Sequence, residues 1–206
     1  MKALTVTVAA VATLILGAVL GVLLLGSESE PGDQSPEAGF ARDMSVHHAQ
    51  AVESSFIVRD STEDPEVRAM AYDIINTQRA QIGMFSGWLQ QWELPQTSVR
   101  PPMEWTDHGH GGAPMESYDD MPGMASDADV QKLRDASGVE AEMLFLELMI
   151  EHHKGGVEMA EAVLPLTKRT EVTYLADTIV AGQQAEIATM EDMLAARKAL
   201  YDPPAG

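Results

Sequence analysis

The sequence predicts an all-α fold in which two similar helical hairpins pack into a four-helix bundle. Apolar residues recur at helical spacing over most of the chain beyond residue 37. Alternating runs of β-branched residues, which are typical of strands, are nearly absent from that region. The chain also repeats itself, and two hairpins that each carry one apolar face can bury those faces against each other.

Composition sets the first 26 residues apart from this fold. Ala3 to Gly26 contains no charged residue, follows the single Lys2, and is followed by the acidic run Ser27 to Glu30. Crossing a bilayer takes about 20 apolar residues, and the end of this segment is a poor signal-peptidase site. We therefore expect residues 1–26 to form a transmembrane anchor, with a cleaved signal segment as the alternative, and residues 27–36 to form a linker. The charges that flank the span predict that the rest of the chain is extracytoplasmic, or secreted if the segment is cleaved.

Charge and sulfur content narrow the partners. The formal net charge is −19 at pH 7, which repels nucleic acids and anionic lipid surfaces and attracts cations. The acidic surface is also a candidate contact face for a protein partner. Because the chain has no cysteine, it forms no disulfide, and methionine is the only sulfur ligand for a metal. The sequence indicates no oligomeric state.

The chain contains an internal duplication with an offset of 105 residues. Residues 37–89 align with residues 142–194 without a gap, and 17 of the 53 aligned pairs are identical. We therefore expect an approximate twofold axis to relate the two halves.

The first hairpin is expected over residues 37–94. Apolar residues recur at helical spacing from Phe40 to Val52, and again from Ala71 to Leu89. Between these runs, Asp60 to Pro65 breaks the pattern.

The second hairpin is expected over residues 127–200, with its break at Pro165. It is preceded by a short helix, expected from Asp129 to Ala136 and stopped by Gly138, which has no clear equivalent in the first half. Gly155 and Gly156 lie inside a predicted helix, where close approach of another helix is the simplest explanation.

A loop rich in proline, glycine and methionine joins the hairpins over residues 95–126. Its length makes it either a functional or a mobile segment. Six methionines and histidines cluster within 22 positions of it: Met103, His108, His110, Met115, Met121 and Met124. The Met121-Pro-Gly-Met124 spacing suits Cu(I), and His108-Gly-His110 suits Cu(II). These residues could serve as a capture or transfer arm.

The duplication repeats one motif, MSVHHAQAVE at 44–53 and MIEHHKGGVE at 149–158. Imidazole binds copper, zinc, iron and nickel, and thioether suits soft Cu(I). A twofold axis would bring the histidines and methionines of both copies into one region, since they share one side of each helix. The sequence thus predicts a divided metal site whose ligands are Met44, His47, His48, Met149, His152, His153 and Met159.

A structural interpretation stands beside this one. Methionine often fills gaps in helical cores, and a histidine on an apolar face is often a buried hydrogen-bonding residue. Neighbouring helical residues point about 100° apart, so one histidine of each pair could face the loop or solvent. Gln78 and Gln183 lie within apolar runs, where an interhelical hydrogen bond is favoured over support of a metal-ligating histidine.

These motifs resemble the family called domain of unknown function 305, over residues 37–199. The resemblance rests on Gly39–Met44, Val46–Val52, Leu133–Gly138, Leu144–His153 and Gly156–Ala160. It implies a ferritin-like bundle, often exported, with copper binding attributed to some members. The family pattern continues each His-His pair into a Met-Ala step; Met159-Ala160 keeps it and Ser54-Ser55 departs from it.

The leading hypothesis is an extracytoplasmic protein that sequesters or handles copper and is not an enzyme; zinc or another divalent metal is the alternative ligand. None of the six histidines follows a glutamate by three residues, so the Glu-x-x-His pattern of di-iron oxidases is absent. The second hypothesis is a structural or protein-interaction bundle in which the histidine pairs form core hydrogen bonds. A metal-dependent redox enzyme is the least favoured, because no cofactor motif is visible.

Overall fold

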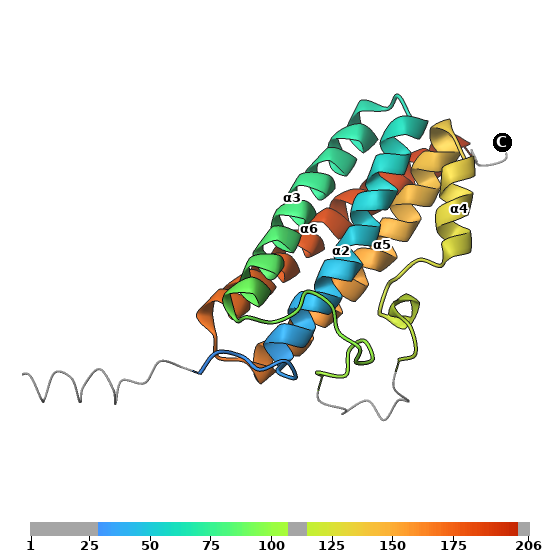
Figure 1. Cartoon of the computed structure of the whole chain (residues 1–206). Coiled ribbons are helices and arrows are strands. Elements are labelled where there is room, and N and C mark those ends of the chain that lie inside the picture. Colours follow the sequence, from blue (N-terminus) through green and yellow to red (C-terminus); the bar gives the residue numbers. More distant parts are fainter. Residues whose placement is uncertain (1–28, 107–114, 202–206) are drawn as a thin grey trace, which may run out of the picture. The chain divides into compact units, whose positions relative to one another are not determined.

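The computed structural model describes residues 29–106 and 115–201. The chain divides into two compact units, Met1–Pro31 and Gly32–Gly206, and every helix described here belongs to the second. These helices are α2 (Pro36–Ser61), α3 (Pro65–Gln91), α4 (Asp127–Asp135), α5 (Gly138–Val163) and α6 (Thr170–Tyr201), with 3₁₀ turns at Tyr118–Asp120 and Leu164–Leu166 (Figure 1). Over this part of the chain there is no strand, and the all-helical prediction is confirmed.

The expected anchor, residues 1–26, lies outside the described residues, as do His108 and His110. Among the helices that the structure describes, none is both long and apolar enough to cross a membrane.

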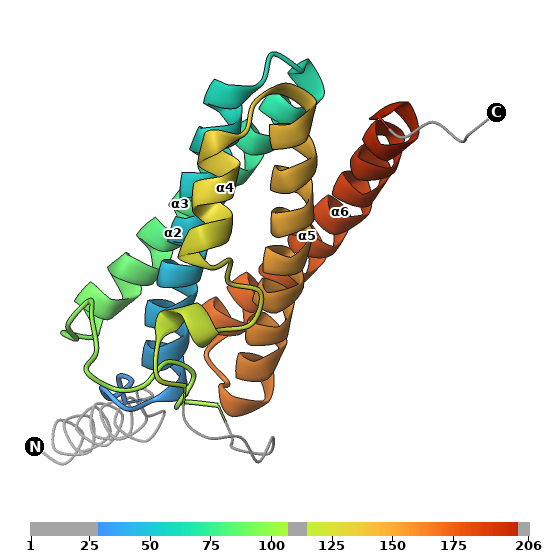
Figure 2. The same cartoon turned by 90° about the vertical axis from the view of Figure 1, so that its right-hand side faces the viewer.

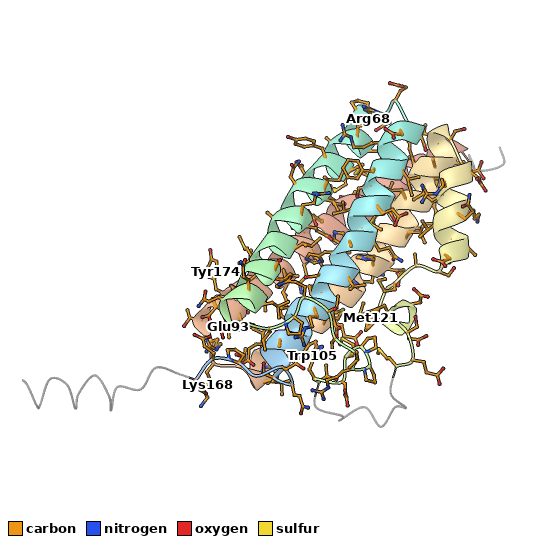
Figure 3. The ribbon with its side chains drawn as sticks, viewed as in Figure 1. Arg68, Glu93, Trp105, Met121, Lys168 and Tyr174 are labelled. Atoms are coloured by element: carbon orange, nitrogen blue, oxygen red, sulfur yellow. The ribbon has the colours of Figure 1, made fainter. Side chains whose placement is uncertain are left out.

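The helices form two hairpins that pack against each other. Helix α2 packs on α3, α5 packs on α6, and α2 and α5 meet between the hairpins. The short helix α4 lies along α2 and α5, as the turned view shows (Figure 2). The connection between α2 and α3 lies at the end marked by Arg68, and the connection between α5 and α6 lies at the end marked by Glu93 and Lys168 (Figure 3).

Local sequence signals set the helix starts. Ser35 accepts a hydrogen bond from the backbone N–H of Ala38, and Asp64 accepts two, so each side chain satisfies N–H groups at a helix start. A proline follows each cap at the first helical position, where its missing N–H costs nothing. Helix α4 also begins at a side-chain cap, Ser126, which accepts a hydrogen bond from the backbone N–H of Asp129.

Equivalent positions of the two halves make equivalent contacts. Thr62 Oγ1 donates to Glu142 Oε1 over 2.5 Å, and its counterpart Thr167 donates to Glu37 Oε1 over 2.6 Å. Each contact joins the turn of one hairpin to the first helix of the other. The expected approximate twofold relation is therefore present in the contacts.

The second helices of the two hairpins, α3 and α6, are also linked, by a different kind of contact at each end of the bundle. Asp64 Oδ1 lies 2.8 Å from Arg197 Nη2, which joins the start of α3 to the end of α6. At the symmetry-related position, the guanidinium of Arg169 lies 5.7 Å from the Trp92 ring centroid. An ion pair in one half thus corresponds to a cation–π contact in the other.

The core consists of two apolar clusters separated by a polar layer. One cluster, near the long loop, holds Phe40, Phe85, Met44 and Met159, together with Met103, Trp105 and Met121 of the loop itself. The other holds Phe145, Leu146 and Met190, near the turn between α2 and α3. Between them lie the buried polar side chains His47, His48, Gln78, Gln81, His152, His153 and Gln183.

The structure corrects the expected role of Gly138. The sequence predicted that Gly138 stops the short helix, whereas α4 already ends at Asp135 and Gly138 is the first residue of α5. Gly138 has a φ of 57°, in the left-handed region that glycine adopts easily. It reverses the chain between two consecutive helices.

The close approach of another helix expected at Gly155 and Gly156 is found only at Gly156, where the neighbour is a side chain of α6. At Gly155 a side chain would collide with the backbone of Pro122 and Gly123 in the long loop, which are its nearest neighbours. At Gly156 a side chain would collide with the amide of Gln183 from α6. The two glycines make room for the loop and for a buried side chain.

We expect Gly155→Ala to lower the free energy of unfolding by about 1–3 kcal/mol, because the loop backbone must move to admit the methyl group. Gly83→Ala is the matched control: it lies in α3 with open space around it, and alanine should raise the same quantity by about 0.5–1 kcal/mol. Urea unfolding of both variants measures the difference. Equal effects of the two substitutions would contradict the loop contact.

Candidate metal centre

The two histidine pairs come together in the middle of the bundle. His47 and His48 on α2 and His152 and His153 on α5 are all fully buried, so none of them faces solvent. Of the two alternatives expected for one member of a pair, only contact with the long loop is found, and only for His47. The rings of His47 and His152 stack across the interface, with centroids 3.8 Å apart and planes inclined by 32°. Within each pair the centroids are 6.3 and 6.2 Å apart.

The outer histidine of each pair is held by the second helix of its own hairpin. His48 Nε2 lies 2.7 Å from Gln81 Oε1 on α3, and His153 Nε2 lies 2.8 Å from Glu186 Oε2 on α6. Gln81 and Glu186 occupy equivalent positions, 105 residues apart. The two halves therefore orient the ring in the same way, through an amide in one and a carboxylate in the other.

The inner histidines contact backbone carbonyls. His152 Nε2 donates to the carbonyl of His47 over 2.9 Å. The twofold relation would give His47 the carbonyl of His152, but His47 Nε2 instead donates to the carbonyl of Pro122 over 3.1 Å. The long loop breaks the symmetry here, and Gly155 provides the space in which it does so.

These partners determine where the ring protons lie. Carbonyl and carboxylate oxygens only accept hydrogen bonds, so Nε2 carries a proton in each ring. Burial lowers the pKa of His47 to about 4, burial and the neighbouring His47 lower the pKa of His48 to about 3, and burial lowers the pKa of His152 well below 6.5. These three rings are neutral at pH 7, and Nδ1 carries a lone pair.

Nδ1 is buried without a hydrogen-bond partner in all four histidines, as judged within the described residues. The side-chain amide atoms of Gln78 and Gln183 are likewise buried and have no hydrogen-bond partner among the described residues. The interhelical hydrogen bond expected for them is therefore not formed in that part of the chain. The hydroxyls of Ser54 and Ser55 complete this group. A buried polar atom without a partner is costly, and such a concentration is typical of a site that receives a ligand.

The four buried histidines, His47, His48, His152 and His153, form what we call the histidine layer. The predicted methionine ligands lie on both sides of this layer. Met44, Met121 and Met159 are buried in the cluster near the long loop. Met149 is buried in the other cluster. The twofold arrangement brings the four histidines together but places Met44 and Met149 in different halves of the core.

The described part of the long loop packs against α2. Asp43 Oδ2 accepts hydrogen bonds from the backbone N–H of Met103 and from Trp105 Nε1, each over 2.7 Å. Burial raises the pKa of Asp43. Met121, labelled in Figure 3, is only 2% exposed. Met124 is half-buried, so these two residues belong to the packed protein and not to an exposed arm.

The donors fit a soft or borderline metal better than a hard one. In residues 29–106 and 115–201, no three side chains of His, Asp or Glu converge as a preformed metal cage. The available donors are buried imidazole Nδ1 atoms with methionine thioethers one helical turn away. Ligating histidines characteristically donate their other ring N–H to a carbonyl or carboxylate, and all four do so here.

Sequence reasoning missed three residues that hold the rings. Gln81 and Glu186 are not identical, so the repeat did not mark them, although each lies 33 residues after the histidine it contacts. That shared separation is a signal that could have found them. Nothing in the sequence indicates that Pro122 contacts His47.

Several proteins of known structure are similar to this chain. A DUF305 protein from Streptomyces coelicolor, described as a candidate secreted protein, is 49% identical, with a TM-score of 0.73 over 81% of this chain and 96% of that chain. A DUF305 fragment from Deinococcus radiodurans is 34% identical, with a TM-score of 0.65 over 78% of this chain and 95% of that one. A comparison with curated proteins gave no match.

CopM is a third similar protein. Its Cu(II)-bound form is 30% identical, with a TM-score of 0.59 over 77% of this chain and 95% of that chain. Its Cu(I)-bound form is 26% identical with the same TM-score, over 76% and 94%. The sequence pattern of the family described as "Domain of unknown function (DUF305)" matches residues 37–194. With this match and the likeness to the two DUF305 structures, the chain belongs to the DUF305 family.

Proposed function

We propose that this protein binds copper in the histidine layer and serves to sequester or hand over the metal. The observation that carries the proposal is the set of four buried imidazoles, each held through Nε2 and each with an Nδ1 that has no partner among the described residues. Such rings are oriented in advance for ligation through Nδ1. The related CopM is described in Cu(I)-bound, Cu(II)-bound and silver-bound forms, which supports this choice of metal.

The proposal includes a location and a class. We infer a ferritin-like four-helix bundle on the outer side of the cytoplasmic membrane, tethered by residues 1–26 or released if that segment is cleaved. A binding protein without catalysis fits the site, because the histidines are fully buried and leave no open face for a substrate.

A competition titration of the purified protein with Cu(I), Cu(II) and Zn(II) tests this proposal. The variant carries alanine at His47, His48, His152 and His153, and the control carries alanine at His108 and His110 of the long loop. We expect the wild type and the control to bind copper with similar affinity. The affinity of the four-histidine variant should be lower by at least 100-fold, while its helical circular dichroism is retained. Equal affinity of wild type and four-histidine variant, with both folded, would contradict the proposal.

One observation favours a second candidate, a purely structural bundle. His152 donates to the carbonyl of His47 across the interface of α2 and α5, so part of the histidine layer joins the two halves directly. In that case the metal-free protein would bind none of the three ions, and alanine at the four histidines would unfold it. Measuring the metal content and the thermal unfolding of the wild type and of the four-histidine variant distinguishes the two candidate functions.

A further inference from the structure

Residues 121–125 of the long loop, which we call the strap, are attached to α2 beside the histidine layer. Gln50 of α2 forms two hydrogen bonds with the backbone of Ala125: Nε2 donates to the carbonyl over 2.9 Å, and Oε1 accepts from the N–H over 2.8 Å. On the same helix, His47 Nε2 donates to the carbonyl of Pro122 over 3.1 Å. The strap is thus bound to α2 at two points, three residues apart.

The strap also lies closely against α5. A side chain at Gly155 would collide with the backbone of Pro122 and Gly123. In the opposite direction, a side chain at Gly123, whose φ is 74°, would collide with the backbone of Glu151 and His152. The two glycines let the two backbones meet, so the strap bridges α2 and α5 just before it runs into α4 (Figure 2).

The duplication provides a separate sign that these contacts matter. Gln50 and Gly155 are 105 residues apart and therefore occupy equivalent positions of α2 and α5. The first position provides an amide that binds the strap, and the second lacks a side chain where the strap passes. Both copies thus serve a segment that lies outside the duplicated ranges 37–89 and 142–194.

The strap is the part of the wall around the histidine layer that can move at the lowest cost. The four rings are fully buried, so a solute reaches them only when part of this wall moves. Helices α2, α3, α5 and α6 have 26 to 32 residues each, whereas the strap is five residues of irregular backbone. Segments with few contacts open locally at a small fraction of the free energy of unfolding.

We propose that the strap is a gate, which swings away from α2 and α5 and admits solute to the histidine layer. Its two hinges keep their own hydrogen bonds as it moves: Asp120 Oδ2 accepts from the N–H of Ser117 before the strap, and Ser126 caps α4 after it. Burial of Met121 and Ala125 favours the closed position. The inference rests on the proposed function, since the gate is the route by which an ion reaches the buried rings.

Opening of the gate would not expose the four histidines equally. His47 loses its hydrogen bond to Pro122 and becomes accessible first. His152 comes next, because its ring stacks on that of His47. His48 and His153 remain covered, because Gln81 of α3 and Glu186 of α6 hold them on the far sides of the two hairpins.

Chemical labelling of the metal-free, full-length protein tests the gate. Diethyl pyrocarbonate acylates a neutral imidazole nitrogen that it can reach, and mass spectrometry resolves the initial rate at each histidine. We expect His47 to react fastest. Gln50→Leu removes both hydrogen bonds to Ala125 at similar volume and should raise the rates at His47 and His152 about 10-fold. Gln96→Leu is the control, since it removes a bond from the long loop to Ser86 and should change neither rate.

The dependence on urea separates local opening from global unfolding. At urea concentrations well below the unfolding midpoint, the rate at His47 should stay level, because opening of five residues exposes little surface. Equal rates at all four histidines that rise together with urea would show that labelling requires unfolding, and would overturn the gate. Unchanged rates in Gln50→Leu would overturn it as well.

The rate of copper uptake connects the gate with the proposed function. Transfer of Cu(I) from a coloured chelator should be faster in Gln50→Leu by the same factor as labelling of His47, with the affinity at equilibrium unchanged. Equal uptake rates in the wild type and this variant would overturn the gate as the route of the ion. Absence of copper binding in the wild type would overturn the proposed function, whereas labelling would still decide whether the strap opens.

Discussion

Acidifying the metal-free protein from pH 6 to pH 4.5 is expected to reduce its free energy of unfolding steeply. His47 and His48 have pKa values of about 4 and about 3 in the folded protein, against 6.5 for a solvated imidazole, because burial disfavours the charged ring. Between these values the unfolded chain binds protons that the folded protein does not. Lowering the pH therefore favours unfolding.

The sign and the size of this change in the free energy of unfolding follow from the pKa values of His47 and His48. Each lowered pKa contributes stability that is complete above pH 6.5 and is lost as the pH falls toward the folded value. The slope is about 1.4 kcal/mol per pH unit for each ring, so the two together remove on the order of 4 kcal/mol over this range. His152 adds to the loss, and Asp43, whose pKa is raised, opposes it. The total free energy of unfolding of a typical domain is only about 5–15 kcal/mol.

Urea unfolding at half-unit pH steps measures this slope. His48→Gln serves as the comparison, since the glutamine can still face Gln81 but cannot take up a proton. It should reduce the pH slope by about one proton, whatever it does to stability at pH 7. A stability that is level between pH 6 and pH 4.5 would show that the rings are already charged or hydrated in the folded state.

Replacing Arg197 by methionine is expected to lower the free energy of unfolding by about 3–5 kcal/mol, because it leaves a buried carboxylate without its counter-charge. Arg197 and Glu142 are 7% and 5% exposed, and Arg197 Nε lies 2.7 Å from Glu142 Oε2. The guanidinium also reaches Asp64 at the start of α3, so the same substitution loosens the contact between α3 and α6.

Two controls isolate the buried charge as the cause. Arg134 pairs with Glu53 over 2.7 Å at the surface, and Arg134→Met should cost less than about 1 kcal/mol. The double variant Arg197→Met, Glu142→Gln should recover much of the loss, because the amide can still accept from Thr62 without carrying a charge. Thermal unfolding of the set in one buffer provides the comparison. A double variant no more stable than Arg197→Met would point to packing and not to charge.

The repeat explains which parts of the protein could be predicted. It predicts two helical hairpins and a twofold relation, which bring the histidines of both copies into one region. The pairing of His47 with His152 is known only from the structure. Capping by Ser35 and Asp64 follows equally from local signals. Such features depend on hydrophobic periodicity and on hydrogen-bonding groups that are close in sequence, and both can be read from the amino-acid sequence.

The remainder depends on contacts without a sequence period. The loop that contains Trp105 and Pro122 packs on α2 through a buried aspartate and a histidine, and irregular backbone gives no pattern from which to derive such pairs. The role of Gly155 depends on that loop and was unpredictable for the same reason.

The twofold contacts also determine the order in which this protein can fold. Inside each hairpin the histidine contacts close 33 residues of chain, whereas the hydrogen bonds between the hairpins join residues 80, 105 and 130 positions apart. Short closures are faster, so each hairpin forms before the two dock. The ribosome completes α2 and α3 some 105 residues before their counterparts, an interval of roughly 5 to 20 seconds at ordinary synthesis rates. During that interval the first hairpin exposes the apolar face that its twin will later cover, and the chain is then most prone to aggregate.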